Sequence, residues 1–263
     1  MGATIGRAGA NCKREHTGLG RVMDFAEADI WIFDLDNTLY PPEMALFPQI
    51  EARMTEWVMR MLSVEREAAD RLRRDYWMRH GTTLAGLMAE HAIDPAAYLG
   101  HVHDIDFTGL VPAPGLARAI AALPGRKIVH TNADSAYAAR VLAARGLDVF
   151  EAVFGVEETH FHPKPDPRAY EAVIDMAGID PARAVFFEDD PRNLRVPHRL
   201  GMRTVLVGPG RHGPNDSAPE AEIGNHVDHR IGDLEAFLCR IVPGQPPGQN
   251  GGRDRNVRGR RCR

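Results

Sequence analysis

Five short apolar runs, separated by segments with helical periodicity, constrain the fold of this chain more than any other feature. The runs are rich in Ile, Val or Phe and occupy residues 29–34, 127–131, 152–156, 184–188 and 204–207. Runs this short and this apolar are typical of strands that are buried on both faces. Because helical patterns alternate with them, the sequence predicts an α/β fold, a Rossmann-like parallel sheet with helices on both faces.

The helices expected between these strands carry the usual end signals. They are predicted near residues 114–123, 134–145, 167–177 and 191–200. Gly146, Gly178 and Gly201 follow the last three of them, at the position where glycine commonly ends a helix.

One long segment interrupts the alternation directly after the first run. Residues 43–110 contain helical patterns without an intervening strand, predicted as a first helix followed by others near 64–79, 82–91 and 95–103. In the first helix, apolar residues recur at intervals of three and four, which marks one buried face. An insert that leaves the C-terminal end of a strand lies over the sheet edge at which α/β proteins bind ligands. We therefore expect residues 43–110 to form a helical cap on a core made of residues 23–42 and 111–242.

The two ends of the chain are expected to be disordered tails. Residues 1–22 lack periodicity, and residues 243–263 are mostly Pro, Gly, Gln, Asn and Arg. The last segment holds six arginines and one aspartate, so the rest of the chain is more acidic than the net charge of −4 indicates. An acidic body is a poor platform for nucleic acid, and a basic tail without a partner is the preferred interpretation.

Composition excludes several other classes of protein. With 44% hydrophobic and 26% charged residues in 263, the chain can bury a core. It has no apolar stretch of the roughly 18 residues that a membrane span needs, and its N-terminus has no apolar signal core, so no membrane association is expected. Cys12, Cys239 and Cys262 are too far apart in the sequence for a disulfide framework or a metal cluster, which favours the reducing cytoplasm.

The first apolar run carries the strongest chemical signal. It ends in Asp34 and Asp36, two carboxylates separated by one residue, and Thr38 follows. Residues i and i+2 share one face of a strand, so both acids can converge on one cation. Burying two acids together is costly unless a cation neutralises them.

This motif resembles the first motif of the haloacid dehalogenase-like superfamily, an apolar strand followed by Asp-x-Asp-x-Thr. The resemblance implies that Asp34 is a nucleophile that accepts a phosphoryl group as an aspartyl-phosphate. It also implies that Asp36 is the general acid–base that protonates the leaving alkoxide and then activates water. The dehalogenase branch lacks the second aspartate, so Asp36 favours phosphoryl transfer over dehalogenation.

The second and third motifs of the family have counterparts in the expected order. The second strand ends at Thr131 and Asn132, and the resemblance implies that the Thr131 hydroxyl and the Asn132 amide hold phosphoryl oxygens. Lys164 lies between two prolines, after a strand and before a helix. A rigidly held ammonium there would offset the repulsion between the nucleophile and the phosphate.

The fourth motif is the acidic end of the run at 184–188, which continues into Asp189 and Asp190. The resemblance implies Mg²⁺ held by Asp34, by Asp36 through its backbone carbonyl, and by Asp189. Glu188, Asn193 and Thr38 are expected to orient these ligands. Three consecutive acids leave the register open, so Asp190 is an alternative to Asp189.

Within the superfamily, several segments resemble the pyrimidine 5′-nucleotidase subgroup. They include the Asn-Thr-Leu-Tyr sequence after Asp36, residues 80–87, residues 103–107 and Thr131-Asn-Ala. The expected activity is Mg²⁺-dependent hydrolysis of a small-molecule phosphate ester, a pyrimidine nucleoside 5′-monophosphate. His80 and Thr83 are the candidates in the cap for contact with substrate. A phosphoglycolate or sugar-phosphate phosphatase is the alternative, and a catalytically silent interaction scaffold is the alternative outside enzymes.

Overall fold

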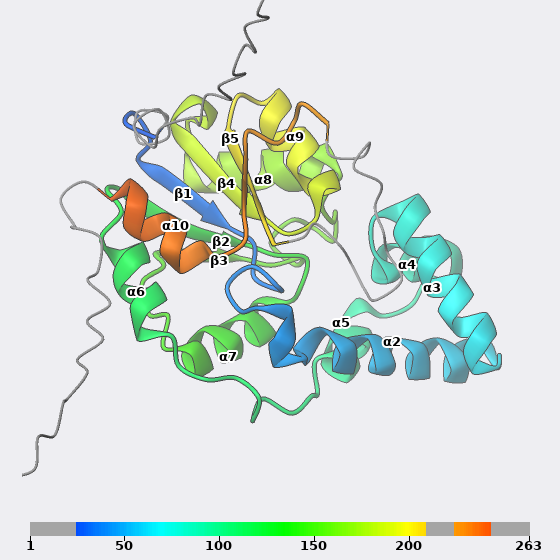
Figure 1. Ribbon diagram of the computed structural model, residues 1–263. Helices are drawn as coiled ribbons and strands as arrows, with labels where there is room; N and C mark the ends of the chain where they lie inside the picture. The colour runs from blue at the N-terminus through cyan, green and yellow to red at the C-terminus, as the bar shows by residue number, and fades with distance from the viewer. Residues whose placement is uncertain (1–24, 209–223, 243–263) are drawn as a thin grey trace, which may run out of the picture.

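The computed structural model describes residues 25–208 and 224–242, and its centre is a six-stranded sheet (Figure 1). All strand pairs are parallel, in the order β3-β2-β1-β4-β5-β6. The strands are β1 Ile30–Phe33, β2 Arg126–His130, β3 Ala152–Phe154, β4 Ala184–Glu188, β5 Arg203–Val207 and β6 His229–Ile231. This confirms the predicted α/β class.

Alternating side chains along the strands form one core layer on each face of the sheet. Trp31 and Phe33 belong to the larger layer, while Ile30 and Ile32 belong to the smaller one. Helices α6 Pro114–Ala121, α7 Ser135–Arg145 and α10 Leu234–Ile241 pack on the larger layer, and α8 Pro167–Ala177 and α9 Arg195–Arg199 pack on the other. Both faces of the sheet are therefore covered, as strands that are apolar on both faces require.

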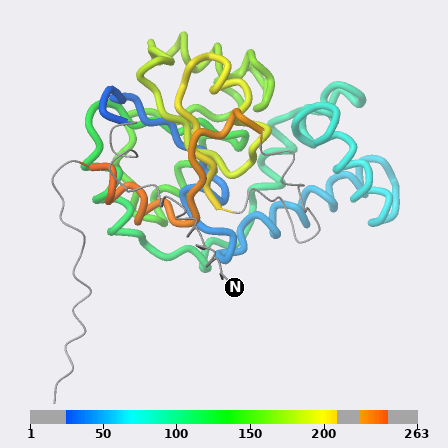
Figure 2. The backbone as a smooth tube through the Cα atoms, turned by 45° about the horizontal axis from the view of Figure 1, so that its top comes forward, coloured from blue at the N-terminus to red at the C-terminus, as the bar shows by residue number. Residues whose placement is uncertain are grey.

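A helical insert follows β1, as the sequence predicts. It begins with the short η1 Pro42–Met44 and continues with α2 Leu46–Leu62, α3 Arg66–His80, α4 Thr83–His91 and α5 Pro95–Val102. Trp57 of α2 meets Tyr98 of α5 edge to face, with ring centroids 5.6 Å apart. Gly86 of α4 lies against Tyr76 of α3 so closely that a β-carbon would come within 2.4 Å of the ring. Figure 2 shows these four helices lying to one side of the sheet.

The structure adds a strand and an α-helix that the sequence analysis did not predict and shortens one helix that it did. Strand β6 contains only one apolar residue in three, so it has no apolar run, and α10 follows it. The helix expected at 191–200 is instead the 3-10 turn η3 Pro191–Leu194 followed by α9. Pro197 favours the break, because it lacks the amide hydrogen that a continuous helix over 191–200 would use at that position.

The two predicted tails, residues 1–22 and 243–263, lie outside the described residues. Among the residues that are described, none of the helices combines the length and the apolar character needed to cross a membrane.

Candidate active site

The first, second and fourth motifs meet at one edge of the sheet. Asp34, Thr131 and Glu188 stand at the C-terminal ends of β1, β2 and β4, which are neighbours in the sheet. The chain passes from β1 to β2 on one side and later places β4 on the other side of β1. In open α/β sheets, ligands bind at such a reversal of strand order.

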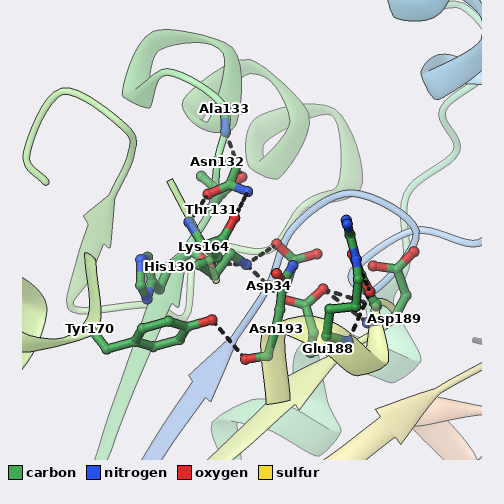
Figure 3. Close-up of polar contacts among 12 residues, drawn as sticks. Asp34, His130, Thr131, Asn132, Ala133, Lys164, Tyr170, Glu188, Asp189 and Asn193 are labelled. Carbon is green, nitrogen blue, oxygen red and sulfur yellow. Dashed lines mark hydrogen bonds and ion pairs between the residues drawn. The ribbon is translucent and has the colours of Figure 1, made fainter. Parts of the chain in front are cut away.

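Lys164 joins these strand ends although it comes from a loop before α8 (Figure 3). Its ammonium donates to Asp34 Oδ1 at 2.7 Å, to Glu188 Oε2 at 2.7 Å and to the backbone carbonyl of His130 at 3.0 Å. The side chain is 1% exposed. All three hydrogens of the ammonium thus have acceptors, which makes a buried lysine tolerable.

The charges at this edge do not balance. Burial and the neighbouring Glu188 raise the pKa of Asp34 to about 7, although the Lys164 ammonium lowers it. Burial likewise raises the pKa of Glu188 to about 7, again against the effect of Lys164. Burial lowers the pKa of Lys164, but the two carboxylates outweigh it and the pKa lies above its ordinary value. One ammonium therefore does not neutralise the buried acids of this edge.

A cation of the kind predicted fits this donor set. One carboxylate oxygen from each of Asp34, Glu188 and Asp189 lies within 4.8 Å of the others, and all three residues are buried. The Oδ1 atom of Asn193 is buried nearby in the same cavity wall and has no hydrogen-bond partner in the structure. Hard oxygen donors with excess negative charge are the ligands that Mg²⁺ prefers. The side chain of Asp36 is not part of this cluster, and its contribution through the backbone carbonyl remains a prediction.

Asp189 and Asp190 have different surroundings. Asp190 Oδ1 accepts the backbone N–H of Arg192 at 2.9 Å, and its carboxylate pairs with the Arg192 guanidinium at 2.8 Å. Glu188 Oε1 accepts the backbone N–H groups of both residues, at 3.1 Å and 3.2 Å. Asp190 therefore caps η3, while Asp189 belongs to the acid cluster, which favours the register with Asp189.

Asn132 has a role that the sequence analysis missed. Its side-chain Oδ1 accepts the backbone N–H of Lys164 at 2.8 Å, and its Nδ2 donates to the Lys164 carbonyl at 3.1 Å. Its side chain thus clamps the lysine loop to the end of β2. The Thr131 hydroxyl accepts from Ala133 N–H at 3.0 Å, which forms a turn at the end of the strand. Thr131 and Asn132 both line the cavity, and their contact with phosphoryl oxygens remains a prediction.

Two tyrosines hold the carboxylate of Asp36. Its Oδ1 accepts from Tyr40 OH at 2.6 Å and from Tyr137 OH at 2.8 Å. Tyr40 is four residues from Asp36 in the first motif, but Tyr137 is 101 residues away, on α7. The sequence pattern gave no role to either tyrosine. The Thr38 hydroxyl is buried without a hydrogen-bond partner in the structure.

A cavity of about 400 Å³ extends from the strand ends into the cap. On the core side it is lined by Asp34, Thr131 and Lys164, and on the cap side by apolar residues and a few polar ones. The cap residues include Phe47, Ile50, Glu51, Met54, Arg73, Trp77, Thr83, Leu84, Tyr98 and Leu99. The cap thus forms the wall of the cavity opposite the strand ends.

The two substrate candidates of the cap lie in different places. Thr83 is buried and lines the cavity, while the preceding Thr82 caps α4 by accepting Ala85 N–H at 3.1 Å. His80 does not line this cavity. It pairs with Glu90 at 3.2 Å and borders a second hollow between the cap and the Lys164 loop. The structure therefore brings Thr83, but not His80, to the predicted site.

The family described as haloacid dehalogenase-like hydrolase matches residues 28–201. The chain belongs to this family of hydrolases. The match covers β1, the cap, the Lys164 loop and the acidic end of β4, so it includes all four groups of residues described above.

Several curated proteins are similar to this chain over part of their length. Phosphate metabolism protein 8 of Saccharomyces cerevisiae is 24% identical over 67% of this chain and 60% of its own length. Protein CbbY of Rhodobacter capsulatus is 31% identical over 51% of this chain and 53% of its own length. N-acetylmuramic acid 6-phosphate phosphatase of Pseudomonas aeruginosa is 26% identical over 49% of this chain and 59% of its own length. The chain therefore spans between half and two thirds of these proteins.

Solved structures share the fold at low sequence identity. An L-2-haloacid dehalogenase superposes with a TM-score of 0.52 at 17% identity, covering 82% of this chain and 100% of its own. The HAD-hydrolase YfnB of Bacillus subtilis, in a magnesium-bound structure, also gives 0.52 at 17% identity, covering 81% of this chain and 98% of its own. These likenesses support the architecture of core and cap.

Proposed function

We propose that this protein is a Mg²⁺-dependent phosphatase that hydrolyses small phosphate monoesters through an aspartyl-phosphate on Asp34. The observation that carries the proposal is the Lys164 ammonium, 2.7 Å from both Asp34 and Glu188 in a buried acid cluster. A fixed cation beside a buried carboxylate lets that carboxylate approach a phosphate dianion. The family includes dehalogenases, and the presence of Asp36 two residues after the nucleophile favours phosphoryl transfer.

The chemistry needs two steps. The Asp34 carboxylate attacks phosphorus, the bond to the leaving alkoxide breaks, and Asp36 in its acid form gives that alkoxide a proton. The Asp36 carboxylate then takes a proton from water, whose oxygen attacks the phosphorus and releases Asp34. Tyr40 and Tyr137, which both donate to Asp36 Oδ1, fix the carboxylate for these two transfers.

Asp34, the backbone carbonyl of Asp36 and Asp189 would hold the cation, with Glu188 orienting the loop that carries Asp189. Bound Mg²⁺ would supply positive charge beside the transferring phosphoryl oxygens. The magnesium-bound structure of YfnB supports this choice of cation within the shared fold. The excess of buried carboxylates over the single ammonium supports it independently.

We propose a pyrimidine nucleoside 5′-monophosphate as the substrate. The cap wall of the cavity combines the aromatic rings of Trp77 and Tyr98 with the hydroxyl of Thr83, a mixture suited to a flat polar base. A sugar phosphate is a second candidate, which the likeness to N-acetylmuramic acid 6-phosphate phosphatase favours.

A phosphate-release screen would test both the proposed phosphatase activity and the proposed nucleotide substrate. Purified protein with Mg²⁺ is assayed on nucleoside monophosphates, sugar phosphates, phosphoglycolate and p-nitrophenyl phosphate, with and without EDTA. The Asp34→Asn variant is expected to retain less than about a hundredth of the activity, because an amide cannot form an acyl-phosphate. Metal-dependent turnover with a sugar phosphate preferred over every nucleotide would reject the nucleotidase proposal alone. No turnover of any ester would reject the phosphatase and favour a scaffold.

A further inference from the structure

His103 ends the last cap helix, α5, and connects the cap to the phosphate side of the core. The residue is 5% exposed, and it lines the active-site cavity. Its Nδ1 forms a short hydrogen bond with Asp134 Oδ2. Asp134 is the N-cap of α7 and accepts the Tyr137 backbone N–H at 2.6 Å with its other oxygen. A cap residue is thus fastened to the helix that begins just after Thr131 and Asn132.

Two further contacts hold His103 in place, one at its ring and one at its backbone. The ring stacks on Tyr137 with centroids 4.3 Å apart and planes 18° apart. The Tyr137 hydroxyl in turn donates to Asp36 Oδ1 at 2.8 Å. The backbone carbonyl of His103 accepts from Arg140 at 2.6 Å. The His103 ring therefore lies directly against Tyr137, whose hydroxyl bonds the proposed general acid, Asp36.

The proton on Nδ1 of His103 decides whether its other ring nitrogen, Nε2, donates or accepts a hydrogen bond. Burial tends to raise the pKa of Asp134, but the bond to His103 outweighs it and the pKa is lowered, so Asp134 is ionised near neutral pH. An ionised carboxylate only accepts hydrogen bonds, so Nδ1 carries a proton. In the neutral imidazole, Nε2 is then an acceptor. None of the side chains or backbone groups in the described ranges is hydrogen-bonded to it.

We propose that His103 is a specificity-determining residue whose Nε2 accepts a hydrogen bond from a hydroxyl group of the leaving alcohol. The proposal rests on the phosphatase function proposed above. Asp36 marks the place of the ester oxygen that receives the proton, and His103, which lines the same cavity, stacks on the tyrosine that bonds Asp36. The atoms it would meet belong to a polyhydroxy alcohol, such as a ribose or another sugar, and not to the phosphate.

A neighbouring histidine provides the control. His101 lies on the same helix, but its ring nitrogens lie 3.1 and 3.2 Å from the Arg60 guanidinium, and it packs against Trp57. It does not line the cavity. The His101→Asn variant should therefore behave as the parent protein on every ester.

The experiment compares two variants of His103, each of which keeps a polar atom near the position of one of the two ring nitrogens. His103→Asn can keep the bond to Asp134 but has no atom at the position of Nε2, whereas His103→Gln can place an amide oxygen near Nε2. Each protein is assayed with Mg²⁺ on ribose 5-phosphate, which carries hydroxyl groups, and on phenyl phosphate, which does not. Inhibition by inorganic phosphate reports on the phosphate site alone.

We expect His103→Asn to lower kcat/KM for ribose 5-phosphate by about 10- to 100-fold, the usual effect of one lost hydrogen bond in a buried site. Its kcat/KM for phenyl phosphate and its inhibition constant for phosphate should change by less than about 3-fold. His103→Gln should recover part of the loss on ribose 5-phosphate. If either variant fails to fold, the other still gives the comparison between the two esters.

Equal losses on both esters would overturn the inference and leave His103 as a residue that only fastens the cap. Unchanged kinetics on both would overturn it as well. If the parent protein releases phosphate from no ester of the phosphate-release screen, nucleotides included, the phosphatase proposal itself fails, an outcome that the parent protein alone reveals.

Discussion

Lys164 Nζ lies 2.7 Å from Asp34 Oδ1, although the two residues are 130 positions apart in the sequence. Both are buried, and the ammonium also holds Glu188 and a backbone carbonyl. The arrangement couples the proposed nucleophile to the loop before α8, so we expect the proposed activity to depend on a residue outside the strand ends.

Replacing Lys164 by Met should lower kcat by at least about 10²- to 10³-fold, since it removes a fixed charge beside the reacting phosphate. The buried carboxyl groups would then hold protons more tightly, so the variant should stay folded at neutral pH by circular dichroism. Lys127→Met is the matched control, because the Lys127 ammonium bonds the Gly125 carbonyl in an exposed position. A Lys164→Met variant with more than a tenth of the parent activity would contradict this role.

Asp189→Ala and Asp190→Ala should fail in different ways. Asp189→Ala removes one member of the acid cluster, so Mg²⁺ binding measured by calorimetry should weaken by at least about 10-fold. Asp190→Ala removes the cap of η3 and the pair with Arg192, and should lower the free energy of unfolding by about 1–3 kcal/mol while Mg²⁺ still binds. The opposite pattern would assign the metal to Asp190.

Mg²⁺ binding should release protons between about pH 5 and pH 7. The pKa values of Asp34 and Glu188 are raised to about 7, so both groups are partly protonated there and the cation must displace those protons. In the metal-free protein, the raised pKa values of these two groups contribute to the free energy of unfolding at low pH. This contribution declines as the pH rises from about 4 to 7, because the carboxyl groups lose their protons at lower pH in the unfolded state than in the folded state. Calorimetry in buffers of different ionisation enthalpy counts the protons. Equal proton release at pH 6 and pH 8 would show that the carboxyl groups are already ionised.

Gly81→Ala should lower kcat. Gly81 has φ of +87°, and a β-carbon would lie 3.2 Å from the Lys164 carbonyl, so alanine would strain the cap and press on the lysine loop. Gly100→Ala is the matched control, because Gly100 lies within α5 with open space around it and alanine there should add up to about 1 kcal/mol of stability. If both variants keep the parent kcat, the contact between Gly81 and the Lys164 loop has no influence on the chemistry.

The sequence by itself determined the class of fold and, together with the resemblance to the family, the candidate positions of the site. Short apolar runs alternating with helical patterns indicate a parallel sheet, because strands buried on both faces typically have that pattern. Acids and a hydroxyl group at the ends of these runs must gather at one edge of such a sheet, so Asp34, Thr131 and Glu188 could be found without coordinates. The insert after the first strand was visible for the same reason, as a helical segment with no strand in it.

Only the tertiary structure decided how these residues are held. The hydrogen bonds of Asn132 to the Lys164 backbone, of Tyr137 to Asp36 and of His103 to Asp134 join segments between 31 and 101 residues apart. Local periodicity reports which face of an element is buried, but it does not report which distant side chain will lie opposite. The packing of the cap on the core makes that choice, and with it decides that Thr83 and His103 line the cavity while His80 does not.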